Sequence, residues 1–292
     1  MSEFLTLTKL RDILEKLDVH LTKSLGQNFL IDRNVRDKIL EFAELEKTDT
    51  IIEIGAGLGQ LTDILVEKTG KVYAFEIEEK FCKFLKRRYS FRKNFYLFCQ
   101  DYLQISSQLF SRLKGKVKVI GNLPYYIASP IIFDILKNRK KIKLALFTVQ
   151  REFGERLVAG PGSKNYGILS VLINLYTETK ICYSLKRHLF YPQPDVDSVV
   201  ILIRPLSEPR IFIKDEKKFW KFLPLIFSYR RKKIINVINI VWKEEKEYID
   251  KKLKESGINP NIRVEQLESE KIYEVFKVVQ NLLSGRKKWE CG

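Results

Sequence analysis

The chain has 292 residues, of which 45% are hydrophobic and 30% are charged. This composition is typical of a globular protein and excludes a disordered chain, and the length allows one main domain with a smaller second one. Lysine and arginine number 53 against 36 aspartates and glutamates, which gives a net charge of +17. Such an excess favours a polyanionic partner, although a lysine-rich genome or a thermophile's charged surface would also produce it.

The cysteines, Cys82, Cys99, Cys182 and Cys291, show no close C-x-x-C spacing, and the chain has only 2 histidines. We therefore expect no metal site and no disulfide framework. The N-terminus lacks the apolar stretch of a secretion signal, and no run approaches the ~18 apolar residues of a membrane span. These features predict a cytoplasmic protein with reduced thiols and no membrane contact.

Helical periodicity predicts an N-terminal helix over residues 4–18, which the motif K-S-L-G-Q-N-F-L follows at residues 23–30. Polar Gln27 and Asn28 in this motif fit either a loop that leads into the next helix or a lid over a ligand. Asp32 has the residue type of an N-cap for that next helix.

A buried strand is predicted over Thr50–Ile54, and it runs directly into the glycine motif G-A-G-L-G at Gly55–Gly59. A helix is expected after it. Glycines at such a turn let the backbone approach a ligand closely, and the helix N-terminus adds polarised N–H groups. The G-x-G-x-G spacing differs from the G-x-G-x-x-G of dinucleotide-binding proteins, which disfavours a nicotinamide-dependent dehydrogenase.

Three further strands are predicted over Lys71–Phe75, Phe95–Cys99 and Val117–Ile120. The polar residues that follow them are Glu76, Asp101 and Asn122. Glu76 has the position of a carboxylate that accepts hydrogen bonds from ribose hydroxyls, and Asp101 fits either an adenine contact or a cap for the next helix. Each residue alone fits an ordinary surface side chain. Together with the glycines they predict a nucleoside-shaped site, because ligands bind at the carboxyl edge of such sheets.

The motif N-L-P-Y-Y begins at Asn122, and we expect the preceding strand to break at Gly121. Pro124 prevents both a continuing strand and a helix interior, so residues 122–125 are expected on a stiff loop. An amide, a backbone carbonyl fixed by the proline and an aromatic face suit a flat ring that carries an amino group. The alternative is a strand-end turn with a packed tyrosine.

Beyond this motif, apolar runs predict a fifth strand over Lys143–Val149 and a helix over Glu152–Val158. A closing antiparallel hairpin is expected from Tyr183–Phe190 and Ser198–Ile203. These elements complete an α/β pattern with a mainly parallel sheet.

Pro205 and Pro209 mark a domain boundary, after which apolar residues return at helical spacing. We therefore expect a main domain over residues 1–205, whose first part, residues 1–48, is helical and lid-like. A small helical domain is expected over residues 206–292.

With these motifs in hand, the chain resembles the ribosomal RNA adenine N6,N6-dimethyltransferase family, specifically the bacterial KsgA-type enzymes that act on small-subunit (16S) rRNA. The motifs that carry the resemblance are K-S-L-G-Q-N-F-L (23–30), E-I-G-A-G-L-G (53–59), N-L-P-Y-Y (122–126), L-V-A-G-P-G-S-K-N-Y-G (157–167), F-Y-P-Q-P-D-V-D-S (190–198) and F-S-Y-R-R-K (227–232). They cover most of the chain in the family's order. Tyr229 departs from the pattern, since a polar amide is expected there.

The resemblance implies an α/β class I (Rossmann-like) S-adenosylmethionine-dependent methyltransferase, with a seven-stranded, mostly parallel sheet and a small C-terminal helical domain. The main domain would bind the cofactor S-adenosyl-L-methionine and carry catalysis. The positions that match the family's cofactor contacts are Gln27, Asn28, Leu30, Gly55, Gly57, Glu76, Asp101 and Asn122. Those that match its catalytic residues are Asn122, Leu123, Pro124, Tyr125 and Phe190.

The target adenine would be flipped out of its RNA and stacked on Tyr125. Phe190 would cover its other face, and the alternative for Phe190 is an ordinary core phenylalanine. Acceptors from the Asn122 side chain and the Leu123 carbonyl would draw the N6 hydrogens out of the ring plane and free the lone pair for attack on the sulfonium methyl. Placement and electrostatics then suffice without a strong base, which agrees with the scarcity of histidine.

The resemblance further implies dimethylation of two adjacent adenines in a small-subunit rRNA hairpin during ribosome biogenesis, by a monomer whose partner is the immature 30S subunit. The residues expected to hold rRNA phosphates are Arg230, Arg231, Lys232 and Lys233. The first alternative is the relative that methylates a large-subunit (23S) adenine and confers antibiotic resistance. A release-factor-type glutamine methyltransferase is disfavoured by Leu123, where that family has a second proline. A third reading is a binding factor in ribosome assembly, or one like the related mitochondrial transcription factors, with methylation secondary.

Overall fold

The computed structural model describes residues 5–19, 21 and 27–283, and the chain divides into two compact units. Unit 1 comprises Met1–Glu155 and Glu178–Ser207, and unit 2 comprises Arg156–Thr177 and Glu208–Gly292. Residues 156–177, although they lie in the middle of the sequence, therefore form one compact unit with the C-terminal helices.

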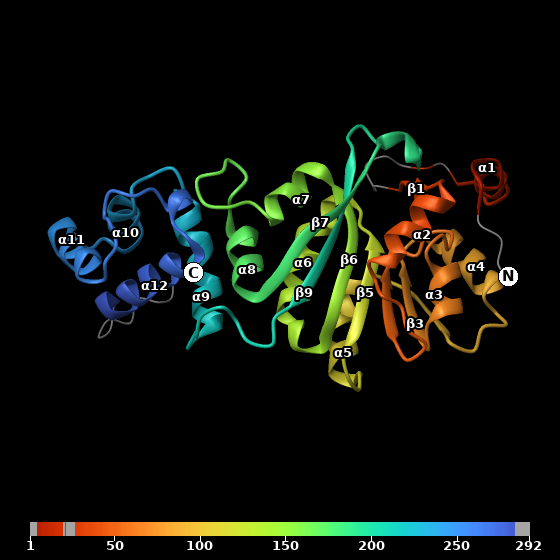
Figure 1. Ribbon diagram of the computed structural model, residues 1–292, viewed down its shortest axis with the longest axis horizontal. Coiled ribbons are helices and arrows are strands. Elements are labelled where there is room, and N and C mark those ends of the chain that lie inside the picture. The colour runs from red at the N-terminus through yellow and green to blue at the C-terminus, as the bar shows by residue number, and fades with distance from the viewer. Residues whose placement is uncertain (1–4, 20, 22–26, 284–292) are drawn as a thin grey trace. The chain divides into compact units, whose positions relative to one another are not determined.

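Unit 1 is built on a seven-stranded sheet with the strand order β4-β3-β2-β5-β6-β9-β7 (Figure 1). The strands are β2 (Thr50–Ile54), β3 (Lys71–Glu76), β4 (Phe95–Cys99), β5 (Val117–Asn122), β6 (Ile142–Gln150), β7 (Thr177–Leu185) and β9 (Ser198–Pro205). Strands β2 to β6 pair in parallel, and β9 pairs antiparallel with β6. This mixed, mostly parallel sheet confirms the predicted fold class.

Helices alternate with the strands along unit 1. They are α1 (Leu7–Lys16), α2 (Arg33–Glu41), α3 (Thr62–Lys68), α4 (Glu79–Arg88), α5 (Tyr102–Arg112), α6 (Ala128–Lys137) and α7 (Arg151–Leu157), the last of which crosses the boundary between the units. The predicted cap of α2 is present, since the Asp32 carboxylate accepts a hydrogen bond of 2.9 Å from the Val35 N–H. Strand residues such as Ile52, Val119 and Phe147 are completely buried, as in a parallel sheet with helices over its faces.

Strand β5 does not break at Gly121, and this prediction is wrong. Gly121 pairs with Ile54 of β2 and with Phe147 of β6, and the strand continues to Asn122. A Cβ atom at Gly121 would lie 2.5 Å from the Ile54 carbonyl oxygen. The glycine therefore allows two strands to approach closely, and it does so inside the sheet rather than at its end.

The predicted strand over Tyr183–Phe190 is also wrong. Strand β7 ends at Leu185, and Phe190 belongs to β8 (Phe190–Tyr191). This short strand pairs antiparallel with β1 (Phe29–Leu30), with Phe190 opposite Leu30, in a separate two-stranded sheet. The pairing brings two of the sequence motifs, K-S-L-G-Q-N-F-L and F-Y-P-Q-P-D-V-D-S, side by side.

Unit 2 is helical. Its helices are α8 (Ile168–Tyr176), α9 (Glu216–Phe227), α10 (Ile234–Trp242), α11 (Lys246–Glu255) and α12 (Ser269–Leu283). Phe219 and Phe222 of α9 contact Phe276 of α12, with ring centroids 5.4 and 5.3 Å apart, and all three rings are buried. This core confirms the helical C-terminal region.

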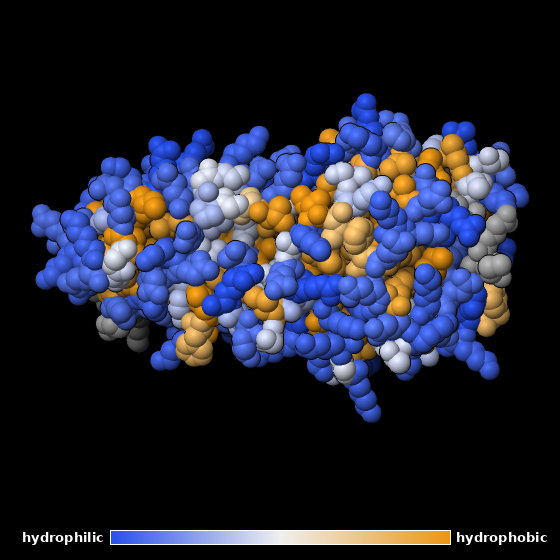
Figure 2. Space-filling model, viewed as in Figure 1, coloured by the Kyte–Doolittle hydropathy of each residue, from blue (hydrophilic) through white to orange (hydrophobic). Residues whose placement is uncertain are grey.

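The face of the molecule drawn in Figure 2 is largely polar. In the view of Figure 2, hydrophilic residues cover most of the face shown and hydrophobic residues appear in smaller areas between them. Over residues 5–19, 21 and 27–283, no helix combines the length and the apolar character that a membrane span requires.

A buried ion pair ties β5 to the chain that precedes β2. The Nζ atom of Lys118 lies 2.6 Å from the Asp49 carboxylate and also donates to the Glu44 carbonyl. The two side chains are only 1% and 8% exposed. Removing one partner from such a pair leaves the other charge buried and uncompensated.

We expect Lys118→Met to lower the free energy of unfolding by about 3 kcal/mol, because Asp49 would lose its cation in a site closed to water. Urea denaturation followed by circular dichroism measures this loss. The matched control is Lys143→Met, since the Lys143–Glu46 pair is exposed and 3.5 Å long; it should cost less than about 1 kcal/mol. Equal losses for the two variants would contradict the prediction.

Candidate active site

A pocket lies at the carboxyl edge of the sheet in unit 1. The predicted site residues that line it are Gln27, Asn28, Leu30, Gly55, Gly57, Glu76, Asp101, Asn122, Pro124 and Phe190. They come from six separate stretches of sequence, which the parallel strands and the β1–β8 pairing bring together. Leu123 is buried behind this wall, and the side chain of Tyr125 lies outside what the structure describes.

The glycine turn after β2 forms one wall of the pocket. Gly55 and Gly57 have φ values of +74° and +57°, a region that side chains disfavour. The N–H groups of Gly55 and Ala56 both donate to the Phe75 carbonyl, at 2.9 and 3.0 Å. A Cβ atom on Gly57 would lie 2.9 Å from the Phe29 ring. The turn therefore needs glycine for its backbone angles and, at Gly57, for space as well.

Glu76 at the end of β3 fastens this turn. One carboxylate oxygen accepts the Gly57 N–H at 2.7 Å, and the other accepts the N–H groups of Ile77 and Glu78 at 2.8 and 2.9 Å. Burial raises the pKa of Glu76, while these backbone hydrogen bonds act in the opposite direction. The carboxylate has room for one more donor, which a ribose hydroxyl could supply.

The side chains of Asp101 and Asn122 each form a hydrogen bond to the protein backbone. An Asp101 oxygen accepts the Leu103 N–H at 2.9 Å and caps α5, so the cap that the sequence allowed is present, and the residue also lines the pocket. The Asn122 amide nitrogen donates to the Asn28 carbonyl at 2.7 Å. This bond fixes the orientation of the amide and leaves its oxygen, Oδ1, as an acceptor.

Sequence reasoning assigned no role to Glu53, which also lines the pocket. The side chain is completely buried, and one oxygen, Oε2, accepts the Thr62 hydroxyl at 2.7 Å. The other oxygen, Oε1, has no hydrogen-bond partner among the described residues. Burial raises the pKa of Glu53 to about 8, and the nearby Asp63 and Glu76 carboxylates add to the shift. The signal in the sequence was an acidic residue within the otherwise apolar strand T-I-I-E-I.

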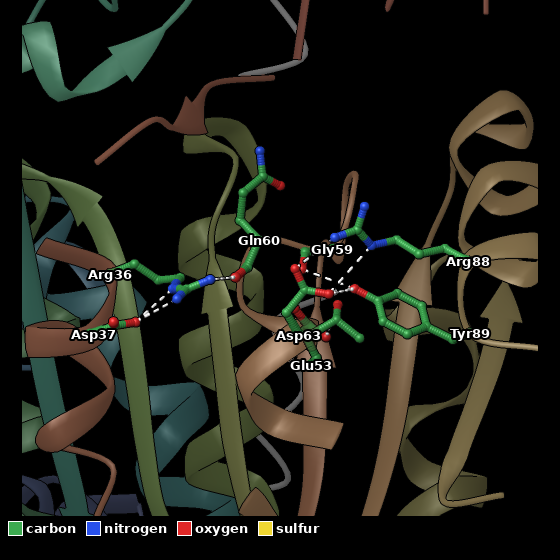
Figure 3. Close-up of polar contacts among 9 residues, drawn as sticks. Arg36, Asp37, Glu53, Gly59, Gln60, Asp63, Arg88 and Tyr89 are labelled. Atoms are coloured by element: carbon green, nitrogen blue, oxygen red, sulfur yellow. Dashed lines mark hydrogen bonds and ion pairs between the residues drawn. The ribbon is translucent and has the colours of Figure 1, made fainter. Parts of the chain in front are cut away.

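Charged side chains hold the far end of the glycine turn (Figure 3). Asp63 of α3 accepts the Tyr89 hydroxyl at 2.6 Å and lies 2.8 Å from Arg88 of α4. The buried Arg36 of α2 reaches the carbonyl of Gln60 at 3.4 Å. The turn is thus joined to three different helices, and sequence spacing gave no sign of these contacts.

The predicted RNA-contact residues lie in unit 2. Arg230 is tethered, since its Nη1 donates to the Tyr166 carbonyl at 3.1 Å and its Nε lies 3.8 Å from Glu265. Arg231 and Lys232 are exposed, as is Lys233, whose Nζ donates to Asn261 at 3.0 Å. The segment 157–167, which carries another sequence motif, reaches the same place, because the Gly162 N–H donates to the Glu265 carbonyl at 2.7 Å.

Comparison with known proteins identifies the family. A model of the ribosomal RNA adenine dimethylase family matches residues 19–281. Proteins named ribosomal RNA small subunit methyltransferase A from Halothermothrix orenii and Geobacillus sp. are each 38% identical to this chain, over 262 and 281 residues. These matches cover 88% and 94% of this chain, and 87% and 96% of the relatives. The crystal structure of a dimethyladenosine transferase from Plasmodium falciparum shares the fold, with a TM-score of 0.72 at 23% identity over 86% of this chain and 96% of that one.

The sequence motifs, the fold and the pocket at the carboxyl edge agree with these matches, and they disfavour the dehydrogenase and glutamine methyltransferase readings. The chain belongs to the ribosomal RNA adenine dimethylase family, and its methyl donor is S-adenosylmethionine.

Proposed function

We propose that this enzyme dimethylates N6 of two adjacent adenines in a hairpin of small-subunit rRNA, within the immature 30S subunit. The observation that carries the proposal is the Asn122 amide, which lines the pocket and whose nitrogen is held by Asn28, so that its oxygen is left as an acceptor. Relatives 36–38% identical are named for the small subunit. We further propose that the enzyme acts as a monomer in the cytoplasm, where ribosomes are assembled.

The pocket fits S-adenosylmethionine on its own geometry. The glycine turn leaves a wall free of side chains where the methionine end would lie, beside Gly55 and Gly57. Glu76 would accept the ribose hydroxyls and Asp101 the adenine amino group. Gln27, Asn28 and Leu30 would close the pocket from the N-terminal side. The cofactor supplies a methyl group on a positively charged sulfur.

On the target side, Asn122 and the backbone of Leu123 would act on the adenine amino group. The Leu123 N–H donates to the Thr148 carbonyl at 3.0 Å, which fixes the Asn122–Leu123 peptide, next to the one that carries the Leu123 carbonyl. Acceptors placed on the two N6 hydrogens pull the nitrogen out of conjugation with the ring, so its lone pair can attack in line. Tyr125 would stack on one face of the base and Phe190 on the other.

The rRNA-contact surface would use the exposed side chains of Arg231, Lys232 and Lys233. Arg230 differs from them, because its hydrogen bond to Tyr166 holds the segment 157–167 in place. We therefore assign Arg230 mainly to positioning this surface and the following three residues to phosphate contacts.

One assay distinguishes the proposal from two alternatives, a resistance-type methyltransferase of large-subunit rRNA and a binding factor in ribosome assembly. Purified protein is incubated with labelled S-adenosylmethionine and either immature small subunits or large-subunit rRNA, and the product nucleoside is identified by mass. N6,N6-Dimethyladenosine in small-subunit rRNA alone supports the proposal, and label in large-subunit rRNA alone supports the resistance-type activity. Absence of transfer to either RNA, with the cofactor still bound, would support a binding factor in ribosome assembly.

We expect Gly57→Ala to weaken S-adenosylmethionine binding at least tenfold, because the new methyl group would meet the Phe29 ring and disturb the turn that Glu76 fastens. Isothermal titration calorimetry measures the Kd. Gly115→Ala is the matched control, since Gly115 also has a positive φ, +82°, but a Cβ there meets nothing within 4 Å. If Gly57→Ala and Gly115→Ala had Kd values equally close to that of the native protein, this role of the turn would be refuted.

We expect Asn122→Ala to lower kcat for methylation by about 10²–10³, the usual effect of deleting an acceptor or donor aligned with the reacting atoms. Single-turnover assays with saturating RNA measure it. Asn138→Ala is the control, because the Asn138 amide is bonded only within α6 and its C-terminal end, to Asp134. Ribosome maturation that proceeds normally in cells carrying only Asn122→Ala would mean that binding is the main role.

We expect Arg231→Gln to reduce the slope of log Kd for rRNA against log salt by about 1, as for the loss of one phosphate contact. Lys217→Gln removes the same charge from the first turn of α9, about 15 Å along the helix from Phe227, where α9 ends, and should leave the slope unchanged. Arg230→Gln should chiefly lower the melting temperature. Identical slopes for Arg231→Gln and Lys217→Gln would contradict the proposed phosphate contact of Arg231.

A further inference from the structure

The Glu53 carboxyl group is an incomplete site in the wall of the cofactor pocket. Its side chain is 0% exposed, one oxygen is bonded to Thr62, and the other has no partner in the described part of the chain. Leaving a buried polar atom without a partner destabilises a protein, so its presence in a ligand pocket indicates that a ligand completes it.

The neighbours of Glu53 are acidic rather than basic. Asp63 from α3 and Glu76 from β3 both act on it electrostatically. Arg88 of α4 is engaged by Asp63, which also accepts the Tyr89 hydroxyl (Figure 3). Across the described residues no lysine or arginine forms an ion pair with Glu53. A buried carboxyl group in such a place holds its proton, and burial accordingly raises its pKa to about 8.

S-Adenosylmethionine brings the cation that the protein does not supply. Its amino acid end carries an ammonium group, and the proposed function places that end beside Gly55 and Gly57, which follow Glu53 in the chain. An ammonium group at Oε1 would give the orphaned oxygen its hydrogen bond and the carboxylate its counter-charge.

We propose that Glu53 is protonated in the free enzyme and releases this proton to solvent when the ammonium group of the cofactor docks on it. In this step one O–H bond at Glu53 breaks, one proton passes to the buffer, and one N–H···O bond forms. The inference rests on the proposed placement of the methionine end, but it concerns cofactor binding alone and does not depend on which RNA is methylated.

The sign of the resulting pH dependence follows from linkage. The ammonium group lowers the pKa of Glu53 in the complex below its raised value in the free enzyme, so binding releases a proton at any pH between the two values. Affinity therefore increases with pH, by up to tenfold per unit, below a pH of about 8. Measurements belong between about pH 6 and 7.5, because α-amino groups themselves lose their proton near pH 8.

The test is calorimetric titration of the purified full-length protein, without RNA, at pH 7 in two buffers of different ionisation enthalpy. The difference in binding enthalpy counts the protons released. We expect close to one proton for S-adenosylmethionine and for S-adenosylhomocysteine, which has the ammonium group but no sulfonium charge. We expect none for 5′-methylthioadenosine, which lacks the amino acid.

Each other outcome overturns the proposal. Release with 5′-methylthioadenosine would assign the proton to Glu76, which faces the ribose. Release with S-adenosylmethionine but not with S-adenosylhomocysteine would assign it to the sulfonium charge. Binding of the methyl donor without release would mean that Glu53 is ionised in the free enzyme or does not meet the ammonium group.

Two variants locate the proton. Glu53→Gln keeps the shape of the protonated side chain and should bind the cofactor with no proton release and with an affinity that is constant from pH 6 to 7.5. Thr62→Val removes the hydrogen bond that favours the ionised form of Glu53, so the pH dependence should persist but move to higher pH. Proton release that survives in Glu53→Gln would refute the assignment. A shift to lower pH in Thr62→Val would do the same.

Discussion

The pocket depends on the three hydrogen bonds that the Glu76 carboxylate accepts from backbone N–H groups. The bond from Gly57 joins the glycine turn after β2 to the end of β3, two chain segments that the parallel pairing of the strands already places side by side. The bonds from Ile77 and Glu78 fix the carboxylate to its own chain segment. Without this anchor the Gly57 peptide, which has a left-handed φ, would lose its main polar partner. The same carboxylate lines the pocket, so one side chain both holds the turn and borders the space proposed for the cofactor. Under the proposed function, a change at Glu76 would act on structure and on affinity together.

The sequence predicted the strand ends well, because a parallel sheet must carry its βα turns at one edge and the motif residues fall at those turns. It could not predict contacts between short, distant segments. The β1–β8 ladder joins Phe29–Leu30 to Phe190–Tyr191, and two-residue strands leave no periodicity to detect. The predicted break of the strand at Gly121 was wrong for a similar reason. Glycine is needed there because the Ile54 carbonyl on the neighbouring strand leaves no room for a Cβ atom. The tether from Arg230 to Tyr166 is likewise visible only in three dimensions.

The chemistry of the site agrees with the scarcity of strong bases in it. Glu53 and Glu76 are buried and have raised pKa values, and neither belongs to the N-L-P-Y-Y segment that is proposed to meet the adenine. The proposed reaction asks the protein to align acceptors with an amino group and to hold a charged methyl donor, and it leaves removal of the product's proton to water. Under the proposed function, the acidic groups would serve ligand recognition and the amide of Asn122 would serve the transfer.

The β1–β8 ladder has a consequence for the order in which the pocket is completed during synthesis on the ribosome. Its second strand leaves the ribosome roughly 160 residues after the first, an interval of roughly 8–30 s at typical bacterial rates. Until then the N-terminal wall of the pocket, with Leu30 and Asn28, has no partner strand to rest on. A nascent chain that has already formed β2 to β6 would thus hold most of the glycine turn but not a closed pocket. Closure of the pocket therefore waits for β8, which is made well after strands β2 to β6 of the sheet.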